Sequence, residues 1–254
     1  MASHPPSMAT KLVRYVALGE ELIRFTAGLA QVATSALRDA GLEQSFRDRV
    51  LTGLALKIDS TFRALLDDAR AARGESMHHL KTMAESFIYF YVVSSDSSDV
   101  TARRLIAKAV HEKLKFFDKN PNYAAPEEVR DWQEWRDELL GSEKQLPSLE
   151  QLAMQHSEGL GSWYSRVFRS ACEPAHVGDL IEFMPDPSGG EIATKSPRGA
   201  SPRAIIAISY GLDIMAALLR TIAETSEVPL PIDADDWNRR IAVVREASSQ
   251  GGSS

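Results

Sequence analysis

Apolar residues recur at intervals of three and four along most of this chain, and that spacing predicts helices throughout. One such stretch runs from Leu12 to Leu37 and a second from Phe46 to Leu66, with Gly41 between them. A glycine in this position favours the end of a helix, and a short connection favours two antiparallel helices. The pattern therefore predicts an all-α fold, a multi-helix bundle of long antiparallel helices.

The rest of the chain continues the same pattern with clear breaks between stretches. Ser148 and Gln151 have the spacing of a capping box, and Ser201-Pro202 is typical of a helix start. Further helices are expected over Leu80–Tyr91, Val100–Phe117, Glu127–Leu140, Trp163–Cys172 and Ile205–Ile222, with a last one starting at Asp233.

The helical pattern is interrupted between Pro185 and Pro202. Ile181–Met184 and Glu191–Thr194 flank a Pro- and Gly-rich turn, which is the arrangement of a small β-hairpin. We therefore expect an irregular or β-hairpin insertion around residues 181–200. Long irregular segments inside a compact domain are often functional.

The length of 254 residues and the hydrophobic fraction of 44% are those of a globular chain with a sizeable core. We expect a disordered leader over residues 1–10, a single helical domain over 11–247 and a disordered tail over 248–254. The single cysteine, Cys172, excludes an internal disulfide. A chain without disulfides fits a reducing compartment, so a cytoplasmic location is expected.

Charge limits the partners that this chain can have. The formal net charge is -6 and no long run of Lys and Arg is present, so general DNA binding is not expected. A small local cationic site for RNA remains compatible with this charge. No uninterrupted apolar run approaches the roughly 18 residues of a membrane span, so no membrane partner is expected.

Arg169 and His176 are the residues best suited to chemistry. Seven residues apart on an ideal helix, they differ by about 20° in azimuth and about 10 Å in rise. A histidine exchanges protons near neutral pH, and an arginine holds a phosphate through two hydrogen bonds. Together they could cleave a phosphodiester without a metal, although Pro174 between them kinks or restarts the helix.

The segment Phe168–His176 resembles part of a family of uncharacterised bacterial helical proteins. That family has an aromatic residue followed by Arg, then a Ser, and a His four residues after the Ser; in this chain Cys172 stands where the Ser is usual, four residues before His176. Met77–Tyr91 and Asp99–Arg104 resemble the earlier helices of the same family, so the likeness covers roughly residues 75 to 185. The helical plan and the Arg and His spacing are in turn similar to the HEPN superfamily, many of whose members are ribonucleases.

The resemblance implies a metal-independent ribonuclease of a bacterial stress or defence system, acting on RNA at a local site. It places the catalytic pair at Arg169 and His176, with Tyr164, Cys172 and Glu173 as supporting candidates. It also implies a homodimer and requires neither a cofactor nor a metal. Attack of an RNA 2′-OH on the adjacent phosphate would proceed with proton transfer by His176.

Two alternatives remain open. The first is a non-catalytic interaction or sensor module on the same bundle, since HEPN members include non-catalytic versions. Trp132 and Trp135 lie on a polar helix, and an exposed aromatic pair there would indicate a protein partner.

The second alternative is a di-metal carboxylate bundle. Glu75 and His78 share the Glu-x-x-His spacing of di-iron bundles, and so do Glu173 and His176. Glu85 and Glu112 are the candidates for the two remaining carboxylates of such a site.

Overall fold

The computed structural model describes residues 8–39, 45–71, 73, 75–172, 202–225 and 234–249. Every regular element within these ranges is a helix, which confirms the all-α class. The expected insertion at 181–200 lies outside the described residues, and so do His176, Glu173 and Pro174.

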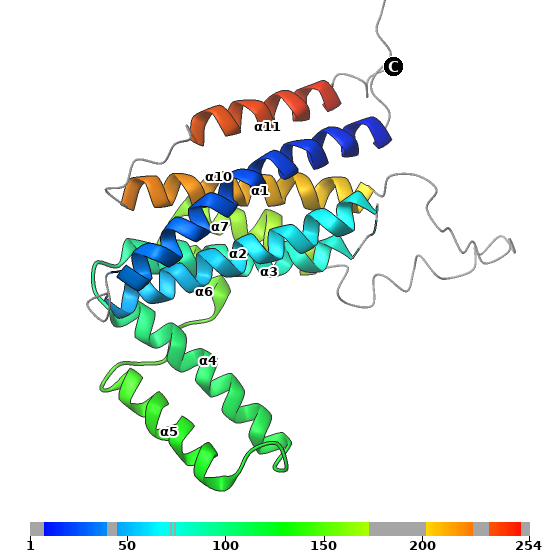
Figure 1. Ribbon diagram of the computed structural model, residues 1–254. Helices are drawn as coiled ribbons and strands as arrows, with labels where there is room; N and C mark the ends of the chain where they lie inside the picture. Colours follow the sequence, from blue (N-terminus) through cyan, green and yellow to red (C-terminus); the bar gives the residue numbers. More distant parts are fainter. Residues whose placement is uncertain are drawn as a thin grey trace, which may run out of the picture.

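Four long helices build the main bundle (Figure 1). They share one large apolar core, in which Phe62, Leu80 and Leu212 are fully buried. The helices are α1 (Met8–Asp39), α2 (Phe46–Arg70), α3 (Ser76–Ser95) and α10 (Pro202–Thr225). Helix α11 (Ala234–Ser249) adds Trp237 and Ile241 to the same core and packs against α1 and α10.

Helix α10 is the most apolar element, and its residues 202–224 are long and apolar enough to span a membrane by length and composition alone. Core helices of soluble proteins have the same properties, and 56% of the apolar window is buried within the bundle. The helix packs against α1, α2 and α3. Gly211 permits a close approach to α2, because a Cβ there would lie 3.2 Å from Leu65 Cδ1 and 3.3 Å from Phe62 Cε2.

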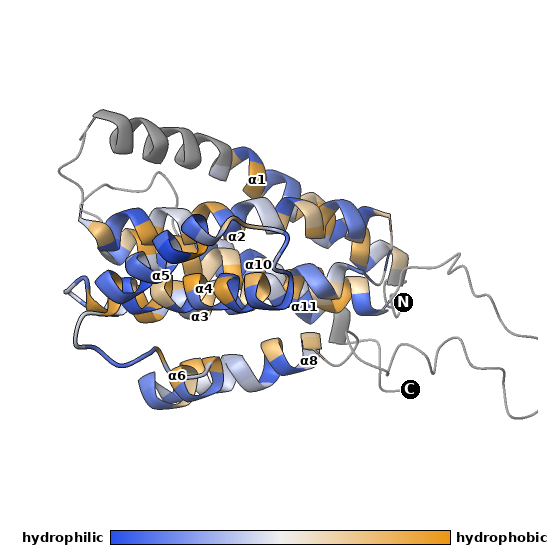
Figure 2. Cartoon of the chain, turned by 90° about the horizontal axis from the view of Figure 1, so that it is seen from below, coloured by the Kyte–Doolittle hydropathy of each residue, from blue (hydrophilic) through white to orange (hydrophobic). Residues whose placement is uncertain are grey.

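A strip of short helices lies along the edge of the bundle farthest from α1 (Figure 2). It consists of α6 (Leu149–His156), α7 (Glu158–Trp163), η2 (Tyr164–Phe168) and α8 (Arg169–Cys172). The predicted capping box is confirmed, because Ser148 accepts from the Gln151 backbone N–H and Gln151 accepts from that of Ser148. The strip packs on α3 through α6, η2 and α8.

The break within this strip lies at Ser157, and not at the two glycines that follow it. Ser157 has an extended backbone and caps α7 by accepting from the Leu160 N–H at 3.1 Å. Gly159 and Gly161 both lie inside α7. A local side-chain cap therefore outweighs the low helix propensity of two glycines.

Helices α4 (Val100–Lys119) and α5 (Pro126–Leu140) form an arm that projects from the bundle (Figure 1). The arm has its own small core, which includes Val110, Leu114, Phe117 and Leu139. Trp132 packs against that core under the Lys113 ammonium, whose Nζ lies 3.6 Å from the ring centre. Trp135 is 39% exposed and Trp132 is half-buried, so the two tryptophans do not form the fully exposed pair that would have indicated a protein partner.

Candidate functional site

Arg169 lies where a π-helical turn returns to an α-helix. The wide turn η2 precedes it, and the Arg169 N–H donates to the Tyr164 carbonyl. Single π-turns of this kind occur frequently at functional sites. The Arg169 side chain is exposed and makes no hydrogen bond or ion pair with the described residues. It is therefore accessible, while the position of its predicted partner His176 is not described.

The supporting residues Tyr164 and Cys172 are both in their protonated forms near neutral pH. Burial and the charge of Glu150 raise the pKa of the Tyr164 hydroxyl above its usual value, against the opposing effect of Arg169. Tyr164 stacks on Phe168 with the ring centres 5.2 Å apart. Burial, mainly, raises the pKa of the Cys172 thiol, so this thiol has no thiolate character that would make it a nucleophile.

The residues considered for a di-metal site do not assemble in the described ranges. No group of three or more His, Cys, Asp or Glu side chains there has the geometry to hold a metal ion. Glu75 and His78 lie at the start of α3, whereas Glu112 lies on the arm, where it pairs with Lys115 at 2.8 Å.

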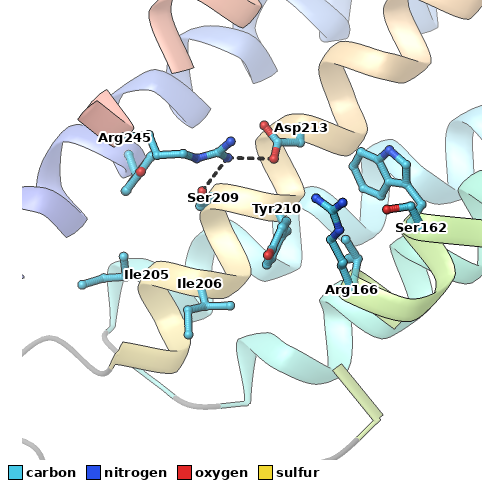
Figure 3. A pocket seen from close by; sticks show the side chains of 11 residues that line it. Ser162, Arg166, Ile205, Ile206, Ser209, Tyr210, Asp213 and Arg245 are labelled. Carbon is cyan, nitrogen blue, oxygen red and sulfur yellow. Dashed lines mark hydrogen bonds and ion pairs between the residues drawn. The ribbon is translucent and has the colours of Figure 1, made fainter. Parts of the chain in front are cut away.

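A pocket of about 450 Å³ opens beside this strip, between η2 and the helices α1, α10 and α11 (Figure 3). This pocket was not predictable from the sequence, because its residues come from four segments far apart along the chain. The lining residues are Tyr15, Ser162, Trp163, Arg166, Val167, Ile205, Ile206, Ser209, Tyr210, Asp213 and Arg245.

Helical spacing explains how two elements contribute most of the lining. Ile205, Ser209 and Asp213 recur every four residues on α10, so they share one face of that helix. Trp163 and Arg166 lie three apart across α7 and η2 and face the same space. The Trp163 ring is held in position by Phe87, with the ring centres 5.7 Å apart.

Arg245 is fixed at one side of the pocket. Its Nη2 atom donates to Asp213 Oδ2 at 2.7 Å and to Ser209 Oγ at 2.9 Å. Burial raises the pKa of the Asp213 carboxyl, and the hydrogen bond and charge of Arg245 oppose that shift. The Asp213 side chain is only 21% exposed, so this carboxylate depends on its arginine partner.

Arg166 lies on the other side of the α10 residues and extends alongside Tyr210 (Figure 3). Within the described part of the chain it has no hydrogen-bond or ion-pair partner. Two arginines and one carboxylate are among the described residues that line the pocket, so the full charges of these residues sum to one positive charge. Such a site can hold an anion, with the unpaired guanidinium as the first contact.

One sequence signal could have indicated this pocket. Asp213 is the only acidic residue within the apolar run from Ile205 to Ile222. A carboxylate in a buried helix requires a partner, and that requirement predicts a polar site against this face of the helix. The identity of the partner, Arg245, could not be predicted from the spacing.

Comparison with known proteins adds no assignment: no protein-family model, no curated protein and no solved structure matches this chain at a significant level.

Proposed function

We propose that this chain is a helical binding module that takes a small organic anion into the pocket between η2, α1, α10 and α11. The observation that supports the proposal most directly is Arg166, a guanidinium without an ion-pair partner among the described residues, in a pocket whose described lining has a net positive charge. The volume of about 450 Å³ lies within the usual range for small-molecule sites. This proposal develops the sensor-module alternative from the sequence.

The lining has the mixed character of a ligand site. Trp163, Val167 and Ile205 provide apolar surface, while Ser162 and Tyr210 provide hydroxyl groups. Apolar walls with a few polar groups are typical of pockets that orient an organic ligand.

The test is a binding experiment with the intact chain. Thermal unfolding and calorimetry with a panel of small carboxylates and phosphate esters should identify at least one anion that binds the parent protein. Arg166→Gln should weaken that binding by about tenfold or more, because a charge-assisted bidentate contact is lost. Arg130→Gln, on the exposed surface of α5, is the matched control and should bind like the parent. Binding that is equal in all three proteins would exclude the pocket as the site.

A second candidate function is the HEPN-like ribonuclease, and the exposure of Arg169 favours it. A residue that contacts an RNA phosphate must be accessible and free of competing acids, and Arg169 meets both conditions within the described residues. This proposal includes a cytoplasmic homodimer in which His176 transfers the proton.

An RNA cleavage assay tests the ribonuclease proposal. Arg169→Ala and His176→Ala should each abolish cleavage that the parent protein shows. Equal cleavage by the parent and both variants would identify a contaminating nuclease and contradict the proposal. Absence of cleavage with retained anion binding would leave the binding module as the function.

A further inference from the structure

We infer that the anion recognised by the pocket is a monocarboxylate attached to an apolar group, and not a phosphate ester; this inference rests on the proposed function. Three properties of the described lining lead to it: the charge balance, the guanidinium of Arg166, which has no partner among the described residues, and the apolar surface.

The charge balance favours one negative charge on the ligand. Arg166 and Arg245 contribute two positive charges and Asp213 one negative charge. A carboxylate brings the sum to zero. A phosphate monoester carries about 1.5 to 2 negative charges at neutral pH and would leave an excess beside the Asp213 carboxylate. Because Asp213 is mostly buried, water screens that repulsion poorly.

The hydrogen-bond inventory favours a planar, two-oxygen group. Arg245 Nη2 already donates to Ser209 and Asp213, whereas no described residue accepts a hydrogen bond from the Arg166 guanidinium. One guanidinium fork matches the two oxygens of one carboxylate. The hydroxyl groups of Ser162 and Tyr210 line the same pocket and can donate further hydrogen bonds.

The apolar surface indicates what the carboxylate is attached to. Ile206 is 44% exposed although it lines the pocket, and it neighbours Ile205 on the same helix. An apolar ring or chain on the ligand would cover part of the apolar lining, which Ile205 and Ile206 provide on α10 and Trp163 provides on α7. Removal of apolar surface from water on both the ligand and the pocket then favours binding.

The test compares four probes by calorimetry at pH 7.5: 3-phenylpropanoate, phenyl phosphate, 3-phenylpropan-1-ol and acetate. We expect 3-phenylpropanoate to bind at least about tenfold more tightly than each of the others, since only it has both the single charge and the apolar group. Arg166→Gln should remove the preference for 3-phenylpropanoate over 3-phenylpropan-1-ol. The control, Arg130→Gln, should keep that preference. Circular dichroism of both variants verifies that the fold is retained.

Asp213→Asn provides an independent measurement of the charge argument. The substitution raises the pocket charge from one to two, so phenyl phosphate should gain affinity relative to 3-phenylpropanoate by about tenfold. Tighter binding of phenyl phosphate to the parent protein would overturn the inference and leave the proposed function intact. Failure of every anion to bind would overturn both the carboxylate inference and the proposed function.

Discussion

Arg245 and Asp213 join α11 to α10, the most apolar helix, through a 2.7 Å ion pair that also forms one wall of the pocket. Asp213 lies on α10 and Arg245 on α11, 32 residues apart in the chain. Burial raises the pKa of Asp213 even though Arg245 opposes the shift. The carboxylate therefore depends on this guanidinium both for its charge and for its position.

Arg245→Gln is expected to lower the free energy of unfolding by about 1–3 kcal/mol at pH 7, because a largely buried carboxylate loses its charged partner. The loss should become smaller in acid. A carboxyl group whose folded pKa is raised binds more protons when folded, so its penalty declines as pH falls through that pKa toward the ordinary value of 3.8. Urea unfolding at a series of pH values between 3 and 7 measures both effects.

Arg239→Gln on the same helix is the matched control for this prediction. Arg239 pairs with Asp236 at 3.3 Å on an exposed surface, so its replacement should change stability by less than about 0.5 kcal/mol. A destabilisation of Arg245→Gln that is no larger than that of Arg239→Gln, or one that grows in acid, would contradict the proposed role of the pair.

Asp96 accepts a hydrogen bond from the first turn of α4, and its contribution to stability is expected to be largest at neutral pH. Its carboxylate accepts from Ser98 N–H and Oγ and from Thr101 N–H. Burial raises the pKa of Asp96, but these hydrogen bonds outweigh burial and hold it below its usual value. Asp96→Ala should therefore cost about 1–2 kcal/mol at pH 7.

The lowered pKa of Asp96 makes its contribution to stability depend on pH in the opposite direction from that of Asp213. A carboxyl with a lowered folded pKa stabilises the fold above its unfolded pKa of about 3.8, and this stabilisation is lost as pH falls below that value. The cost of Asp96→Ala should thus shrink progressively below pH 4 in urea unfolding. Asp118→Asn, an exposed substitution near the end of α4, is the control, and a pH-independent cost of Asp96→Ala would refute the assignment.

The helices were predictable because their signals are local. The periodicity over Phe46–Leu66 corresponds to α2, and the capping box at Ser148 lies at the expected position. Details decided by competing local contacts were less predictable. Before the start of α4, for example, the Asp96 carboxylate accepts three hydrogen bonds, whereas the Ser98 hydroxyl accepts one, from the Val100 N–H. A carboxylate accepts from several donors at once, which a hydroxyl does less well.

The pocket was not predictable because its charges meet only in three dimensions. Arg166 and Arg245 are 79 positions apart, and neither belongs to a recognisable motif. The arm was equally hidden, since the pattern of α4 predicts a helix with one apolar face but not that α5 covers it outside the main bundle. Tertiary placement depends on which apolar faces meet, and periodicity alone does not specify that choice.

Two glycines in long helices should respond oppositely to substitution. Gly53 has no heavy atom within 4 Å of an added Cβ, so Gly53→Ala should raise the free energy of unfolding by about 0.5–1 kcal/mol through helix propensity. Gly211 lies against Phe62 and Leu65, so Gly211→Val should lower it by about 1–3 kcal/mol through overpacking. Thermal and urea unfolding of both variants test the close approach of α10 to α2. Equal changes in the free energy of unfolding for the two variants would contradict that approach.

Adjacent phenylalanines on α4 test whether the arm has a core of its own. Phe117 is 8% exposed and belongs to the arm's core, whereas Phe116 is 46% exposed and contacts Tyr123 at its edge. Phe117→Ala should lower the free energy of unfolding of the arm by about 3 kcal/mol, and Phe116→Ala by less than about 1 kcal/mol. Hydrogen exchange resolved by segment measures this, because α5 packs mainly on α4 and amides of both helices should lose protection in Phe117→Ala. Protection in α2 and α3 should change much less, since their large apolar core does not include Phe117. Equal loss of protection in the arm for the two variants would show that Phe117 does not form a core between α4 and α5.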